Sequence, residues 1–182
     1  MLTEPSFWLV QGLNSLQLAM LLFLLSVGLT VIFGLMNFVN LAHGSLYALG
    51  AFIGYSIAEA LGSVWFAYLF SPLAVAAIGA LLYVTLIDRM RTAGPLPQVL
   101  VTFGLIFVLI DAQKYLWGTD AVGVTEGVPF SGTIHVLGEP YPAYRLFIIT
   151  IGALVYLGLH LLLNRTRSVS YTHLRAHETG YN

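Results

Sequence analysis

Long apolar stretches, separated by short polar segments, dominate the chain. A helix of about 20 apolar residues crosses the hydrocarbon core of a bilayer, and five stretches are close to or beyond that length. They cover Leu16–Leu35, Gly44–Leu61, Trp65–Ile87, Gln98–Trp117 and Leu146–Leu163. The pattern predicts an all-α, polytopic transmembrane helix bundle of about five spanning helices, with a break near residues 37–44.

The predicted break is a cluster of polar residues inside the most apolar part of the chain. No Asp, Glu, Lys or Arg occurs between Pro5 and Ala58. Four polar side chains nevertheless lie close together there, at Asn37, Asn40, His43 and Ser45. Polar groups are costly in hydrocarbon unless they face protein or water. We therefore expect these four side chains to line a path for a polar solute; the alternative is that they cap helices or join neighbouring helices.

Three glycines in and after the break favour close helix packing. Gly50 and Gly54 form a GxxxG pattern, which lets two helix backbones approach closely in a membrane. Gly44 directly follows the histidine of the polar cluster. We expect Gly44, Gly50 and Gly54 to lie at helix contacts, although glycine is common in membrane helices generally.

One acidic residue, Asp111, falls inside a predicted span, near the end of Gln98–Trp117. An ionisable residue within a membrane helix often marks a functional site. Lys114 lies three residues further on, which places the two side chains on the same face of a helix. We expect Asp111 and Lys114 to form an intramembrane ion pair with a structural role.

The composition supports a membrane protein and excludes several other classes. The 182 residues are 58% hydrophobic and 8% charged, with a mean hydropathy of +0.87, whereas a soluble domain carries roughly 25% charged residues. The chain has no cysteine, which excludes a disulfide framework and a cysteine nucleophile. The net charge of −1 provides no basic footprint for nucleic acid.

We expect neither a cofactor nor a metal site in this chain. His177 and Glu178 resemble the start of an HExxH zinc motif, but Tyr181 occupies the position of its second histidine. The sequence also lacks the glycine-rich loop with a terminal Lys-Ser or Lys-Thr that binds nucleotide phosphates.

The distribution of basic residues predicts the orientation of the helices. Four arginines follow the third and fifth predicted spans, at Arg89, Arg91, Arg165 and Arg167. Basic residues in short loops favour the cytoplasmic side. The long polar segment 118–143 therefore faces outward, and we expect a short hairpin within it, around Thr133–Leu137.

The last residues differ from everything before them. Residues 168–182 abandon the apolar pattern and contain histidine, arginine and glutamate. We expect residues 1–167 to form the transmembrane domain and residues 168–182 to be a non-native or disordered tail.

The segment Gly28–Ala51 resembles a signature of the permease subunits of branched-chain amino acid ABC transporters, the LivH-like family. The matching positions are Asn37, Phe38, Asn40, Ala42, His43, Gly44, Tyr47 and Gly50. Three later segments, Val101–Ile106, Leu116–Gly118 and Tyr144–Phe147, follow in the family's order. The likeness extends roughly from Leu13 to Arg167.

This resemblance implies the N-terminal part of a multi-pass permease of the bacterial cell (inner) membrane. Such a subunit provides the translocation path for branched-chain or related small amino acids and carries out no chemistry of its own. The implied partners are ABC ATPase subunits, which bind the ATP, a second permease subunit and an extracytoplasmic substrate-binding protein. Permeases of this kind continue past the matched segment, so the transmembrane domain of residues 1–167 is expected to be incomplete.

Two other classes of protein remain open from the residues alone. A secondary transporter or channel fragment for a small polar solute would need coupling acids at mid-membrane, and Asp111 is the one candidate. An intramembrane enzyme would need a nucleophile in contact with a base. His43 and Ser45 are two residues apart, and side chains at that spacing do not face each other on a helix.

Overall fold

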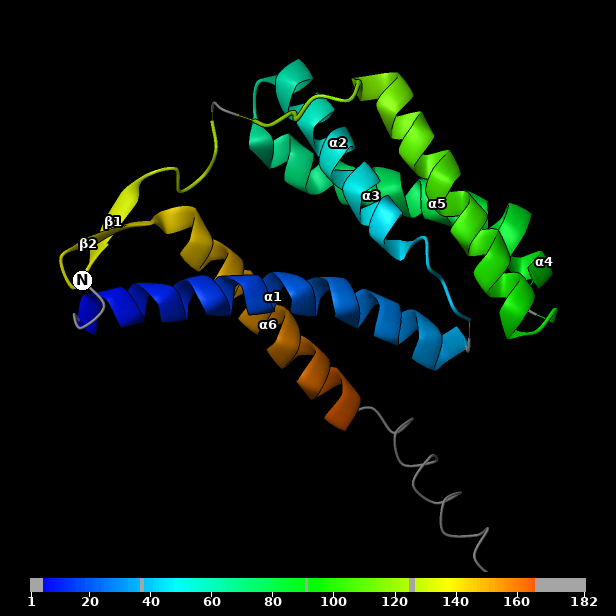
Figure 1. Cartoon of the computed structure of the whole chain (residues 1–182), viewed down its shortest axis with the longest axis horizontal. Coiled ribbons are helices and arrows are strands. Elements are labelled where there is room, and N and C mark those ends of the chain that lie inside the picture. The colour runs from blue at the N-terminus through cyan, green and yellow to red at the C-terminus, as the bar shows by residue number, and fades with distance from the viewer. Residues whose placement is uncertain (1–4, 37, 91, 125–126, 166–182) are drawn as a thin grey trace, which may run out of the picture. The chain divides into compact units, whose positions relative to one another are not determined.

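The computed structural model describes residues 5–36, 38–90, 92–124 and 127–165 (Figure 1). Most of this part of the chain is helical, and the described residues contain one small two-stranded sheet. The prediction of an all-α architecture is therefore confirmed. The predicted tail, residues 168–182, lies outside the described residues.

The chain divides into two compact units. Of the described residues, the first unit combines 5–24 and 132–165, and the second unit comprises those between 25 and 131. Helix α1 (Pro5–Met36) contributes its N-terminal part to the first unit and its C-terminal part to the second.

In the first unit a hairpin leads into the last helix. Strands β1 (Thr133–Val136) and β2 (Glu139–Pro142) pair antiparallel, and α6 (Ala143–Arg165) follows directly. The turn residues Leu137 and Gly138 both have positive φ, 50° and 86°, as the mirror-image turns of two-residue hairpins require. The hairpin expected around Thr133–Leu137 is present, and it extends to Pro142.

Polar and aromatic contacts join α1 to α6 within this unit. Arg145 Nη1 donates to Asn14 Oδ1 at 2.5 Å. The rings of Phe23 and Tyr156 meet edge to face, with 5.9 Å between their centroids. A Cβ atom added to Gly152 would lie 2.8 Å from the Met20 side chain, so a glycine allows the two helices to approach closely at this point.

In the second unit three helices pack side by side. Helix α2 (His43–Leu61) lies against α3 (Val64–Leu82) and against α5 (Pro95–Trp117) (Figure 1). Helix α3 continues through a π-helical turn, η1 (Tyr83–Ile87), into the short α4 (Asp88–Met90). Insertions of π-helical geometry into α-helices are rare and are frequently found at functional sites.

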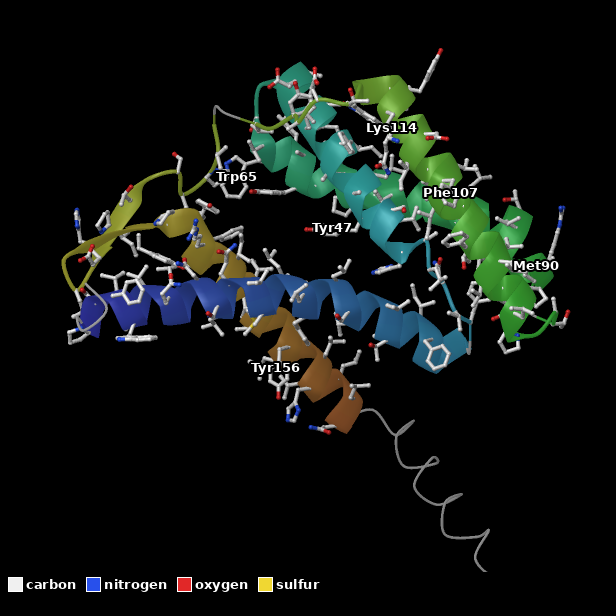
Figure 2. All side chains as sticks on the ribbon, in the orientation of Figure 1. Tyr47, Trp65, Met90, Phe107, Lys114 and Tyr156 are labelled. Carbon is white, nitrogen blue, oxygen red and sulfur yellow. The ribbon has the colours of Figure 1, made fainter. Side chains whose placement is uncertain are left out.

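The ends of these helices follow ordinary sequence rules. Gly62, with φ of 64°, ends α2 in the left-handed conformation that glycine adopts without strain. Pro95 is the first residue of α5, where its missing N–H is not needed. Figure 2 shows Met90 beside this start of α5 and Lys114 near the opposite end.

Four helical segments in the described part of the chain are long and apolar enough to cross a membrane. They are Pro5–Gly34, Val64–Met90, Pro95–Trp117 and Ala143–Asn164. These segments contain four of the five predicted spans, except for Leu35 at the end of the first span. The first begins well before the predicted Leu16. The remaining predicted span forms α2, which has 19 residues but is less apolar because it includes tyrosines, serines and Glu59.

The second unit has two small clusters of buried apolar side chains. Ala42, Leu49, Leu105 and Leu109 form one between the start of α2 and α5, and Ala58, Val64 and Ala67 form the other between α2 and α3. Many large apolar side chains point outward instead, among them Leu73, Leu81 and Val84. An exposed apolar surface of this extent is not found on a soluble monomer, and it suits contact with lipid.

Candidate functional site

The break predicted near residues 37–44 lies between α1 and α2. Residues 38–40 have no regular secondary structure, and a turn leads from Leu41 into His43, the first residue of α2. Phe38 is 1% exposed, Asn40 5% and Ala42 0%. This non-helical backbone is therefore buried against protein, which is the condition for such a segment at membrane depth. Asn37 lies outside the described residues.

Two side chains from α5 satisfy the backbone of the break. The N–H of Leu41 donates to Thr102 Oγ1 at 3.3 Å, and the N–H of Val39 donates to Gln98 Oε1 at 3.5 Å. Thr102 is fully buried and its hydroxyl donates to the Gln98 carbonyl at 2.8 Å. Gln98 Nε2 donates in turn to the carbonyl of Met90 at 3.3 Å. One polar network thus ties the break to both α4 and α5.

Asn40 acts within the break as a local cap. Its Oδ1 accepts the N–H of Ala42 at 3.1 Å, and its carbonyl oxygen is 3.5 Å from the N–H of His43. Because a backbone N–H can only donate, the oxygen of the side-chain amide must face Ala42. The NH2 end then points elsewhere, and no residue in the described part of the chain accepts a hydrogen bond from it.

His43 packs its ring against α1. A Cβ atom added to Gly28 would lie 2.6 Å from His43 Nε2 and 2.7 Å from Cε1. The imidazole therefore occupies the space that any side chain at position 28 would fill. The segment that resembles the family begins at Gly28, but no sequence pattern indicates the contact that this glycine makes.

A side chain of α5 forms a hydrogen bond with the backbone carbonyl of Ser45. Gln113, which is 6% exposed, donates from Nε2 to the Ser45 carbonyl at 2.9 Å. Further along α2, Trp117 Nε1 donates to Ser56 Oγ at 2.6 Å. The structure thus brings Asn40, His43 and Ser45 together at the start of α2, and polar side chains of α5 brace this region.

The buried polar residues of α5 were not recognised as site residues from the sequence. Gln98, Thr102 and Gln113 lie on one face of α5 together with Leu105 and Leu109. Their spacing of three or four residues is that of a single helical face. Polar residues recurring at this spacing within an apolar helix are the signal that could have identified them.

The predicted packing glycines differ in what surrounds them. A Cβ atom at Gly50 would lie 3.2 Å from Val75 Cγ2, and one at Gly54 would lie 3.6 Å from Ser71. Ser71 Oγ also donates to the Gly50 carbonyl at 2.5 Å. Gly50 and Gly54 therefore face α3 at close range, whereas a Cβ atom at Gly44 would meet no described atom within 4 Å.

Asp111 and Lys114 lie in the last two turns of α5. Lys114 Nζ is 4.0 Å from Asp111 Oδ1, and both side chains are more than half exposed. The pair is therefore long and peripheral, with no part in the network at the break. Among the described residues no group of three His, Cys, Asp or Glu side chains could hold a metal ion; His177 and Glu178 lie outside those residues.

A cavity of about 210 Å³ adjoins the break. Its walls come from the C-terminal part of α1, the break, α2, α3, η1 and α5. The lining residues are Ile32, Phe38, Asn40, Leu46, Gly79, Leu82, Tyr83, Ile87 and Leu105. Apart from Asn40 and Tyr83 the lining is apolar, so this is an apolar cavity with one side-chain amide in its wall.

Long apolar helices around a buried, polar break in the backbone define a multi-pass membrane protein. Residues 12–168 match the family model described as the permease component of the branched-chain amino acid transport system. The chain belongs to this family, whose members are transport proteins and not enzymes. No curated protein and no solved structure matched the chain.

Proposed function

We propose that the chain is a membrane-spanning permease subunit of an ATP-driven importer for branched-chain or related small amino acids. In this proposal the chain contributes the translocation path and performs no chemistry. Partner ATPase subunits bind and hydrolyse ATP. The family membership of residues 12–168 supports the transport role, and the importer, its partners and its solute are the proposed part.

The observation that carries the proposal is the braced break between α1 and α2. Transporters use interrupted helices to present backbone groups and helix ends to a solute. Here Thr102 and Gln98 hold such an interruption in place. Asn40, His43 and Ser45 supply neutral polar groups beside it, and neutral groups suit a zwitterion because they do not trap it. We assign these three residues and Asn37 to the solute path.

The other predicted site residues receive structural roles in this proposal. Gly50 and Gly54 support the close contact between α2 and α3, while Gly44 leaves open space at the start of α2. Asp111 and Lys114 form a surface pair that is worth little in stability at this distance and exposure. No coupling acid is required, because ATP drives transport.

The proposed partners follow from the same assignment. They are two ABC ATPase subunits on the cytoplasmic side, a second permease subunit, and a substrate-binding protein on the outer side of a bacterial inner membrane. The segment of residues 118–131, which follows α5, lies on the side where the binding protein would dock if the arginine distribution gives the correct orientation.

Uptake of radiolabelled L-leucine into proteoliposomes tests the proposal. The liposomes contain the chain assembled with the ATPase, permease and binding-protein subunits of its own transport system. Uptake should require ATP on the side of the ATPase and should continue after an uncoupler collapses the proton gradient. The control is the same complex with an ATPase variant that binds but does not hydrolyse ATP. Uptake driven by a proton gradient without ATP would instead identify a secondary transporter.

A further inference from the structure

We propose that the cavity beside the break is the site that receives the aliphatic side chain of the transported amino acid, with Asn40 binding its carboxylate. This inference rests on the proposed transport function and makes it specific. The family description names branched-chain amino acids but no place for them in the fold, and the inference supplies that place.

The size of the cavity fits a branched aliphatic group. An engineered apolar cavity of about 150 Å³ binds benzene, and this cavity measures about 210 Å³. It is therefore large enough for the four-carbon side chain of leucine and part of its backbone. Seven of its nine lining residues are apolar or glycine, so it offers contacts to a hydrocarbon group and few to a polar side chain.

One hydrogen-bond donor remains available at the wall. Asn40 is 5% exposed, and its Oδ1 is engaged by the N–H of Ala42. Its NH2 group has no acceptor in the described part of the chain. The nitrogen is not completely buried, so a solute can reach it. An amide NH2 group at a cavity wall can donate to an acceptor that enters the cavity, and a solute carboxylate would supply one.

Tyr83 is the second polar residue of the cavity lining. Tyr83 lines the cavity, and its hydroxyl donates to Asp88 Oδ1 at 3.2 Å. A carboxylate thus lies one hydrogen bond away from the lining, at the exposed end of η1. An amino acid carries its ammonium and carboxylate groups on the same carbon, so a solute whose carboxylate meets Asn40 keeps its ammonium group beside that residue, outside the apolar part of the cavity where burial would be too costly.

Gly79 offers a direct way to fill the cavity. It lines the space together with Leu82 and Tyr83, which share its helical face because they lie three and four residues further on. A Cβ atom added to Gly79 meets no described atom within 4 Å. Gly79→Leu therefore meets no clash at its Cβ atom, and because Gly79 lines the cavity the added side chain should occupy part of that space.

The experiment compares L-leucine and L-alanine uptake by the assembled transporter. An apolar pocket discriminates by about 10- to 200-fold for each methylene group that fits. Gly79→Leu should lower the kcat/KM for L-leucine at least about 10-fold relative to that for L-alanine. Gly104→Leu is the matched control, because Gly104 is also a helical glycine with open space around its Cβ position and does not line the cavity. It should leave the leucine-to-alanine ratio unchanged.

A second variant tests the role of Asn40. In Asn40→Ser the hydroxyl still accepts the N–H of Ala42, as serine does in turns, but the NH2 donor is gone. The KM for L-leucine and for L-alanine should rise together by about 10-fold, as expected for one lost hydrogen bond to a charged group. L-Leucine should also raise the melting temperature of the detergent-solubilised wild-type chain but not of Gly79→Leu.

The outcomes of these experiments distinguish failure of the proposed transport function from failure of the proposed side-chain site. If the wild-type complex shows no ATP-dependent uptake, the transport function is wrong. If uptake is normal and Gly79→Leu lowers leucine and alanine uptake equally, or changes neither, the cavity is not the side-chain site. A lipid found by native mass spectrometry in the wild-type chain and absent from Gly79→Leu would identify an acyl chain as the true occupant and overturn the inference.

Discussion

At the scale of single residues, the contact between Gly28 and His43 shows how tightly the start of α2 is set against α1. The ring of His43 fills the volume where a side chain at position 28 would lie. Position 28 can therefore hold only glycine if the imidazole is to keep its place. A glycine in an apolar helix is unremarkable by sequence, and only the packing shows which glycine is required.

We expect Gly28→Ala to displace the ring end of the His43 side chain and to give a lower melting temperature in detergent than Gly34→Ala. The lost packing of the ring should offset the gain of up to about 1 kcal/mol that replacing glycine by alanine in a helix otherwise brings. Gly34→Ala is the matched control, because a Cβ atom there meets no described atom within 4 Å. Addition of His43→Ala should restore the stability of Gly28→Ala. Equal melting temperatures for Gly28→Ala and Gly34→Ala would contradict this contact.

At the scale of elements, α5 supplies hydrogen-bond acceptors to the break between α1 and α2, whose backbone N–H groups are not all bonded within the break. In a continuous helix the N–H groups of Val39 and Leu41 would bond within the helix. Here Gln98 and Thr102 accept them from the side. The stability of the break therefore depends on side chains that come much later in the sequence.

We expect Thr102→Val to destabilise the chain by about 0.5–1.5 kcal/mol, because the substitution keeps the shape but removes the acceptor of the part-buried hydrogen bond from the N–H of Leu41. Thermal unfolding in detergent measures the effect. Thr150→Val in α6 serves as the control, since the Thr150 hydroxyl is exposed and bonds only to the Leu146 carbonyl of its own helix. A loss no greater than that of the control would mean that the break does not rely on Thr102.

Sequence patterns accounted for the elements but not for the connections between them. Apolar run length predicted where helices occur, and Pro95 and Gly62 marked helix ends through their backbone preferences. The π-helical turn at Tyr83–Ile87 had no such signal, because it changes the hydrogen-bond register without changing composition. The pairing of Thr102 with Leu41 could not be predicted either, since the donor is a backbone group that every residue type provides.

At the scale of the whole molecule, the arrangement of basic residues predicts which ends of the helices face the cytoplasm. Arg89 lies in α4, close to the start of α5, and the segment 118–131 follows the other end of α5. If α5 crosses the membrane, these two regions lie on opposite sides. Basic residues then assign the α4 side to the cytoplasm.

We expect a cysteine introduced at Ser131 to react with a membrane-impermeant maleimide added to intact cells. A cysteine introduced at Thr92 should react only after the cells are made permeable. Both positions are exposed in the structure, and the chain has no cysteine of its own, so each label reports one site. Labelling of Thr92→Cys from outside, with Ser131→Cys protected, would invert the proposed orientation.

The way in which the break is held also shapes how the sequence can drift over evolutionary time. Since Val39 and Leu41 contribute main-chain N–H groups, replacing their side chains leaves the donors intact. Substitutions at Gln98 and Thr102 are more restricted, because the side chains of these two residues are the hydrogen-bond acceptors. In an alignment of close relatives, positions 39 and 41 should therefore vary in side chain while positions 98 and 102 stay confined to residues that can accept a hydrogen bond.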